Sequence, residues 1–219
     1  MINVSKRKSQ IKIDDIESDL TFKIITIGDC GVGKTSIFKR LVYNTFELNT
    51  ISTIGLNILK KDIELDNRIT IHLELSDTAG QEKFRSLSKS YFRNSNAILF
   101  VFDLNKEESF ENIKYWIKIL NNNYNYKKRT LIYLIGNKKD LEQKVKSDLI
   151  NSFLKKKNYI YRSISAYKND NNEIQKLFKE ISNKLYENYM NSLGESKNIS
   201  QNSIPIISMR QRTNFLLCE

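Results

Sequence analysis

The chain has 219 residues, a length that suits one domain with appendages. Its 36 lysines and arginines against 25 aspartates and glutamates give a formal net charge of +11. Its two cysteines, Cys30 and Cys218, exclude a disulfide framework and a cysteine-rich metal site, so we expect a reducing, cytosolic setting. The basic residues are scattered and no aromatic residues are interleaved with them, so we expect no nucleic-acid partner.

The chain is expected to begin with a polar extension, a strand, a glycine-rich loop and a helix. Residues 1–19 are polar and basic, which predicts a mobile extension outside the fold. The apolar run Phe22–Ile27 predicts a buried strand, and apolar residues at helical spacing after the loop predict a helix that ends near Tyr43. The loop between them reads G-x-x-x-x-G-K-T, the pattern of a phosphate-binding loop.

This loop carries the chemistry of an anion site. The N-terminus of the following helix leaves backbone N–H groups unsatisfied and carries a partial positive charge, and both attract phosphate. Lys34 is expected to reach the β- and γ-phosphates of a nucleotide, and the Thr35 hydroxyl to ligate Mg²⁺. The loop residues expected to bind the nucleotide are Asp29, Cys30, Gly31, Val32, Gly33, Lys34, Thr35 and Ser36.

The next segment is expected to form a loop, two strands and an irregular helical stretch. Residues 44–54 lack periodicity and predict a loop. Leu56–Leu65 and Ile69–Ser76 predict two strands joined by a short turn, and the second alternates apolar with polar residues. Asp77 follows directly, and a polar, irregular helical segment is expected to run to about Asn94.

The second half of the chain alternates strands with helices. Apolar runs predict buried strands at Ala97–Phe102, Leu131–Ile135 and Tyr159–Ile164. Ser109 is expected to cap a helix, and residues 147–156 to form another. A last helix is expected to run to about Tyr189. The buried stripe of the helix after Ser109 is expected to be Phe110, Ile113, Trp116, Ile117 and Leu120. The buried stripe of the last helix is expected to be Ile174, Leu177, Phe178, Ile181 and Leu185.

This order of elements predicts an α/β fold with a mostly parallel, six-stranded sheet and helices on both faces. Ligands of such sheets bind at the carboxyl ends of the strands. We expect a domain over residues 20–190 and a disordered C-terminal tail over residues 191–219, where serine, asparagine and glutamine dominate. No apolar signal segment opens the sequence, and no apolar run approaches membrane-spanning length.

Two further motifs follow predicted strands. Asp77-x-x-Gly80 fits a sensor of Mg²⁺ and the γ-phosphate, because the carboxylate can hold the metal shell and the glycine N–H can approach the phosphate closely. Asn137-Lys138-x-Asp140 fits a guanine site. Its carboxylate can accept hydrogen bonds from the N1–H and amino groups of guanine, whereas adenine would leave the acid unpaired.

The combined motifs resemble those of small GTPases of the Ras superfamily, over roughly residues 20–190 and in the family's order. The superfamily set is Gly28, Lys34-Thr35, Thr53, Asp77, Gly80-Gln81, Asn137-Lys138-Lys139-Asp140 and Ser165-Ala166. The stretches most similar to Rab proteins are Ser52-Thr53-Ile54-Gly55, Asp77 to Leu87, Tyr91-Phe92-Arg93 and Phe102-Asp103. The resemblance implies the fold of a P-loop NTPase, specifically a small G domain.

The resemblance also implies roles for single residues. Thr53 would be the second hydroxyl ligand of Mg²⁺, and Phe46 would pack edge-on against guanine. Ala166, after Ser165, would offer its backbone N–H to the guanine oxygen. Gln81 would orient the attacking water, which makes Gln81, Lys34 and Thr53 the catalytic set. An activating protein would supply an arginine, so hydrolysis by the chain alone should be slow.

Four positions depart from the Rab pattern. Ile58 and Ser76 stand where Rab proteins usually carry a phenylalanine and a tryptophan of the partner-binding surface. Thr50 replaces a tyrosine, and Tyr167 replaces the lysine that usually follows Ser-Ala. The departures concern the partners more than the nucleotide, although Tyr167 could stack at the base site.

Three functions stay open on the sequence. The first is a Rab-type GTP/GDP switch in vesicle traffic, with an exchange factor, a GTPase-activating protein and effectors as partners, cycling between the cytosol and an intracellular membrane. The second is a GTP-dependent scaffold with little hydrolysis. The third is a Ran-like nuclear transport GTPase, which Arg85-Ser86-Leu87 and a non-acidic tail disfavour. Membrane attachment would depend on Cys218, in a terminus that lacks the paired cysteines of Rab tails and is not a C-a-a-X box.

Overall fold

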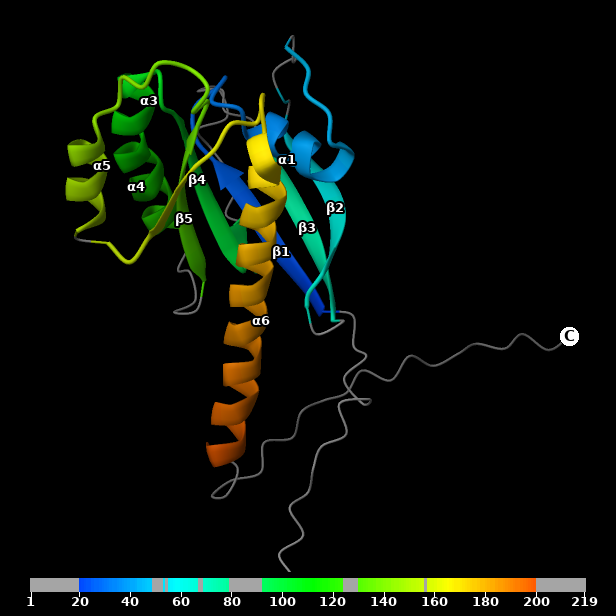
Figure 1. The fold of residues 1–219 in the computed structure, drawn as a ribbon. Coiled ribbons are helices and arrows are strands. Elements are labelled where there is room, and N and C mark those ends of the chain that lie inside the picture. Colours follow the sequence, from blue (N-terminus) through cyan, green and yellow to red (C-terminus); the bar gives the residue numbers. More distant parts are fainter. Residues whose placement is uncertain are drawn as a thin grey trace, which may run out of the picture. The chain divides into compact units, whose positions relative to one another are not determined.

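The computed structural model describes residues 20–48, 53, 55–66, 69–78, 92–123, 130–155 and 157–199. Within them six strands form one sheet in the order β2-β3-β1-β4-β5-β6 (Figure 1). The strands are β1 (Leu20–Ile27), β2 (Leu56–Glu64), β3 (Thr70–Thr78), β4 (Ala97–Asp103), β5 (Leu131–Asn137) and β6 (Ile160–Ser163). Every neighbouring pair is parallel except β2 with β3. The expected mostly parallel sheet is confirmed.

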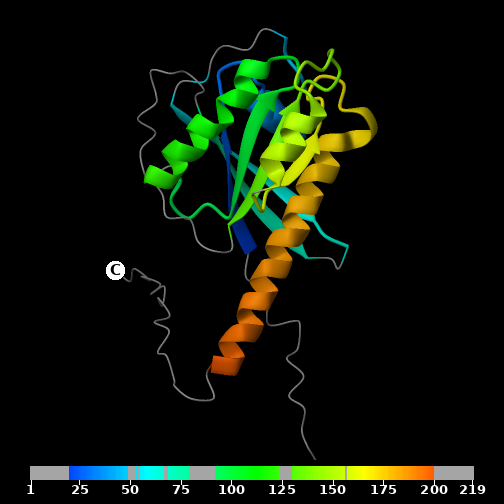
Figure 2. The ribbon, with the colours of Figure 1, turned by 90° about the vertical axis from the view of Figure 1, so that its left-hand side faces the viewer.

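The helices cover both faces of this sheet (Figures 1 and 2). They are α1 (Lys34–Tyr43), α3 (Glu107–Glu111), α4 (Ile113–Asn123), α5 (Ser147–Leu154) and α6 (Glu173–Ile199), with a short 3₁₀ turn, η3 (Asp170–Asn172). On one face the apolar side chains of α3, α4 and α5 pack on β1, β4 and β5. On the other face α1 meets α6, where the Phe38 and Phe178 rings lie 6.0 Å apart.

The strands of the centre were the easiest to predict, because burial on both faces selects continuous apolar runs. Every residue of β4 is buried, and so are all residues of β5 after Leu131. Strand β3 runs through Asp77 and Thr78, two residues past its expected end. Asp77 is therefore held rigidly in the sheet by pairing with Asn57 of β2.

Two helix boundaries differ from expectation. Ser109 does not cap α3: the cap is Lys106, and the Ser109 hydroxyl, inside the helix, donates to the Lys106 carbonyl at 2.7 Å. That hydroxyl also accepts from the backbone N–H of Asp103 at 3.0 Å, so it ties the helix to the end of β4. Helix α6 continues past the predicted end at Tyr189 to Ile199. The prediction followed the apolar stripe, which stops before the helix does. Polar residues can prolong a helix that packing has already started. The predicted irregular helix before Asn94 lies largely outside the described residues.

A polar clamp holds α6 to the β5–β6 edge of the sheet. Glu180 accepts from Arg162 Nε at 2.9 Å and Nη2 at 2.8 Å, and from the Tyr133 hydroxyl at 3.1 Å.

Replacing Glu180 with glutamine should lower the free energy of unfolding by about 1 kcal/mol, because the bidentate charged pair is lost while the size is kept. Urea unfolding measures this change. Glu187→Gln, at an exposed position of the same helix, is the control and should change little; equal losses in both variants would contradict the clamp.

Candidate functional site

The phosphate-binding loop connects β1 to α1 and depends on two of its glycines. Gly33 caps α1 in the left-handed region, with φ 94°. A Cβ atom there would lie 2.3 Å from Nδ2 of Asn137, and one at Gly28 would lie 2.1 Å from the Val101 carbonyl oxygen. Both distances are far inside van der Waals contact. The loop can therefore pass this close to β4 and β5 only where side chains are absent.

Lys34 extends back across the loop. Its ammonium donates to the carbonyl oxygens of Gly28 at 2.9 Å and Asp29 at 2.7 Å, and the residue is 5% exposed. Burial lowers the pKa of Lys34 to about 8, although the charges of Asp77, Cys30 and Asp29 oppose the shift. Burial therefore disfavours the charged ammonium, and a nearby negative group would favour it. A phosphate group would supply that charge.

Three oxygen-bearing side chains meet at the start of α1. Thr35 Oγ1 donates to Asp77 Oδ2 at 2.6 Å and lies 2.8 Å from Thr53 Oγ1, which lies 3.3 Å from the same carboxylate oxygen. Asp77 is 1% exposed, and among the described residues its Oδ1 makes no hydrogen bond. Burial raises the pKa of Asp77, and the hydrogen bond from Thr35 and the charge of Lys34 oppose that shift.

This donor set fits Mg²⁺. The ion prefers hard oxygen ligands, and in nucleotide sites it is held by one or two carboxylates together with phosphates and water. Two hydroxyls and a buried carboxylate with an unsatisfied oxygen are of that kind. Within the described part of the chain, no group of three or more His, Cys, Asp or Glu side chains is placed to hold a metal ion. When bound, the ion would neutralise phosphate charge.

The Asn137-Lys138-x-Asp140 segment joins three parts of the site. Asn137 Nδ2 donates to the Val32 carbonyl at 2.8 Å, and Asn137 Oδ1 accepts from the backbone N–H of Ala166 at 3.1 Å. The Ser165 hydroxyl donates to Asp140. Asn137 therefore works as a brace between the phosphate loop and the segment around Ala166.

An aromatic pair stands beside Asp140. Phe46 and Tyr167 meet edge to face with centroids 5.1 Å apart. Arg40 of α1 supports both: its Nε and Nη2 donate to the carbonyls of Ala166 at 3.0 Å and Tyr167 at 2.9 Å, and its guanidinium lies 6.0 Å from the Phe46 centroid. Tyr167 is thus an aromatic wall where the Rab pattern usually has a lysine.

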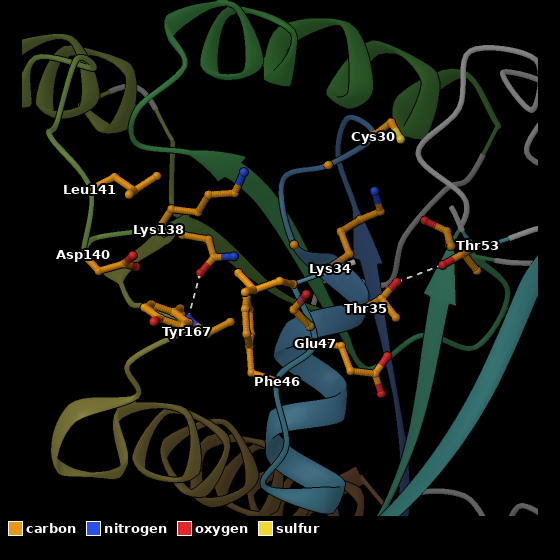
Figure 3. Close-up of a pocket in the computed structure, with 17 residues that line it drawn as sticks. Cys30, Lys34, Thr35, Phe46, Glu47, Thr53, Lys138, Asp140, Leu141 and Tyr167 are labelled. Carbon is orange, nitrogen blue, oxygen red and sulfur yellow. Dashed lines mark hydrogen bonds between the residues drawn. The ribbon is translucent and has the colours of Figure 1, made fainter. Parts of the chain in front are cut away.

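Most of these groups line one cavity of about 500 Å³ (Figure 3). Asp140 and Tyr167 lie at one end, Thr35 and Thr53 at the other, and Lys34 and Phe46 between them. Such a volume suits a ligand of nucleotide size. The predicted site residues that line the cavity are Cys30, Gly31, Gly33, Lys34, Thr35, Ser36, Phe46, Thr53, Asn137, Lys138, Asp140 and Ala166.

The other predicted site residues have different positions. Asp77, Val32 and Ser165 support the lining through the hydrogen bonds given above. The carboxylate of Asp29 is turned to α4 instead, where it accepts from Trp116 Nε1 at 2.7 Å. Gly80 and Gln81 lie outside the described residues.

The sequence did not predict the residues that support the site by contacting its other residues. Asp103 pairs with the Lys138 ammonium at 2.7 Å. A signal for it was available, because Phe102-Asp103 is among the stretches most similar to Rab proteins, and the structure makes Asp103 the register partner of Asn137. Arg40 gave no such signal, since nothing local in a helix face indicates carbonyl partners more than a hundred residues away. Glu47, Leu48, Thr78 and Leu141 also line the cavity without having been predicted.

Comparison with known proteins agrees with this geometry. The model of the Ras family matches residues 23–187. The chain belongs to the Ras family. It is 36% identical over 171 residues to Ras-related protein Rab-5B of Plasmodium falciparum (isolate 3D7), covering 78% of this chain and 81% of that protein.

Two further relatives carry Ras-related names. Ras-related protein YPTC6 of Chlamydomonas reinhardtii is 33% identical over 174 residues, 78% of each chain. Ras-related protein RABA1c of Arabidopsis thaliana is 32% identical over 189 residues, 84% of this chain and 86% of its own length. The expected fold of a P-loop NTPase and the Rab-like small GTPase are confirmed.

Two departures from the Rab pattern lie opposite each other in the sheet. Ile58 and Ser76 are cross-strand partners of β2 and β3. Ile58 is 48% exposed, but Ser76 is completely buried. A serine is small enough to be enclosed at a position where the Rab pattern has a tryptophan, so the loss of two aromatic side chains from the partner-binding surface stays a prediction. Thr50 lies outside the described residues.

Proposed function

We propose that this Ras-family chain is a Rab-type switch, which binds GTP and GDP with Mg²⁺ and regulates vesicle and membrane traffic. One observation carries the nucleotide assignment: a buried lysine, a hydroxyl–carboxylate cluster and a carboxylate beside an aromatic pair line or support one cavity. Lys34 would bind the β- and γ-phosphates, and Thr35, Thr53 and Asp77 would hold Mg²⁺. Asp140 would select guanine.

Hydrolysis needs positioning and charge stabilisation more than covalent chemistry. Gln81 would orient the attacking water, while Lys34 and the backbone N–H groups at the start of α1 hold the phosphates. Ala166 would donate its N–H to the base, and Phe46 and Tyr167 would pack against it. The regulators would be an exchange factor and a GTPase-activating protein. Effectors would bind a surface that includes exposed Ile58.

Changing Gln81 to leucine should slow hydrolysis and leave GTP affinity nearly unchanged, because this side chain acts on water and not on the bound phosphates. We expect single-turnover rates on the order of 10⁻⁴ s⁻¹ for the unaltered chain and at least about tenfold less for the variant. Phosphate release from preloaded GTP measures both. Gln143→Leu, at an exposed position outside the cavity, is the control. Equal rates in all three proteins would favour a GTP-dependent scaffold over a hydrolysing switch.

We attribute attachment to the cytosolic face of an intracellular membrane to a lipid. The helices in the described part of the chain include none with the length and hydropathy of a membrane span. The proposed anchor is a prenyl group on Cys218. One chain gives only marginal binding. The basic residues Lys6, Arg7, Lys8 and Lys12 would add about 1 kcal/mol each near an anionic leaflet.

Cys218→Ser should therefore abolish membrane association in the native cells, and neutralising the four basic residues should make it weaker and more sensitive to salt. Fractionation at low and high salt measures both effects, with Ser203→Ala in the same tail as the control. Intact-mass analysis of the membrane fraction reports the lipid. An unmodified Cys218 on membrane-bound protein would contradict the proposed anchor.

A further inference from the structure

The carboxylate of Asp29 is held away from the nucleotide cavity by two neutral donors. Its Oδ2 accepts from Asn112 Nδ2 at 2.8 Å and its Oδ1 from Trp116 Nε1 at 2.7 Å. Asn112 ends α3, and Trp116, on α4, is 4% exposed. The phosphate loop, whose neighbouring residues Cys30 and Gly31 line the cavity, is thus bonded to the junction of two helices.

An acid in this loop needs such an arrangement. Two like charges 4 Å apart repel by about 4 kcal/mol near a protein surface, so a carboxylate turned toward bound phosphate would weaken binding. Hydrogen bonds to both oxygens hold the charge on the far side of the loop. The Asp29 carbonyl also accepts from the Lys34 ammonium at 2.7 Å. One residue therefore links the helices to the phosphate-binding lysine.

We propose that Asp29, Asn112 and Trp116 form a tether that positions the phosphate loop and slows the release of bound nucleotide. This inference rests on the proposed nucleotide function. All three are positioning residues: the tether acts through the loop backbone and through Lys34. A purely structural role would differ in one respect, because loss of the hydrogen bonds would then lower stability without changing nucleotide release.

The tether can be broken and rebuilt with the same two side chains. Asn112→Asp sets two carboxylates against each other and removes the amide donor. Adding Asp29→Asn exchanges the partners: the new amide can donate to Asp at 112 while its oxygen still accepts from Trp116. The swap therefore keeps both hydrogen bonds, and its effect separates pairing from any general consequence of changing residue 112.

The experiment measures release of radiolabelled GDP from the full chain, with magnesium fixed and unlabelled GDP in excess. We expect Asn112→Asp to speed release about tenfold, and the double variant to return to within about twofold of the unaltered chain. Asn121→Asp, the same change at an exposed position of α4, is the matched control and should not alter release. Trp116 is the only tryptophan, so its emission should change in Asn112→Asp and recover in the swap.

Unchanged release in Asn112→Asp, or a swap that fails to restore it, would overturn the tether. Should Asn112→Asp not fold, Asn112→Ala removes the donor without adding charge and must still speed release. An unaltered chain that does not retain GDP overturns the proposed function itself, and with it the tether's role. That result is recognised before any variant is made.

Discussion

Changing Asp140 to asparagine should move the preference of the site from guanine to xanthine nucleotides, with a change of about 10³-fold in the ratio of GTP to XTP affinity. The carboxylate suits the two donors of guanine, N1–H and the amino group. Xanthine presents an oxygen in place of the amino group, which suits the asparagine amide. Each mismatch leaves a buried polar group unpaired at about 2 kcal/mol, and the substitution reverses two of them.

Competition of GTP, XTP and ATP against a labelled nucleotide measures this ratio in both proteins. The Ser165 hydroxyl, which donates to Asp140, can donate equally to the amide oxygen, so the loop should keep its form. Asp148→Asn makes the same change at an exposed position of α5 and should leave the ratio unaltered. Equal affinity of the unaltered chain for ATP and GTP would contradict the guanine assignment.

Local patterns predicted most of the fold because they arise from local causes. The apolar runs of β4 and β5 reflect burial on both faces, and the loop before α1 reflects backbone geometry that only glycine tolerates. Parallel strands also bring their carboxyl ends together, so Asn137 and the phosphate loop could be expected to meet before any distance was known. The 2.8 Å bond from Asn137 to Val32 has that origin.

What the sequence did not predict depends on partners far along the chain. Trp116 was correctly assigned to the core from its helical spacing, yet its bond to Asp29 spans 87 residues and leaves no periodic signal. The bonds of Arg40 to Ala166 and Tyr167 are of the same kind. Ser109 was predicted to cap a helix from its residue type alone. A serine inside a helix can equally donate to a nearby carbonyl, as Ser109 does here.

Changing Gly33 to alanine should nearly abolish GDP binding and lower the free energy of unfolding by about 3 kcal/mol or more. The left-handed backbone at φ 94° costs an alanine about 1 kcal/mol. The new Cβ would also lie 2.3 Å from Asn137 Nδ2 and displace it. The Val32 carbonyl and the Ala166 N–H would then lose their shared partner, at about 1–3 kcal/mol for each buried group left unpaired.

Gly55 offers a matched control for the backbone term. Its φ is 76°, also left-handed, but a Cβ there would meet no atom of the residues that the structure describes within 4 Å. Gly55→Ala should therefore cost only the conformational strain, about 1 kcal/mol, and the difference between the two variants isolates the collision with Asn137. Urea unfolding and GDP titration measure both quantities. Equal losses of stability in the two variants, or tight GDP binding by Gly33→Ala, would show that Asn137 does not brace the phosphate loop.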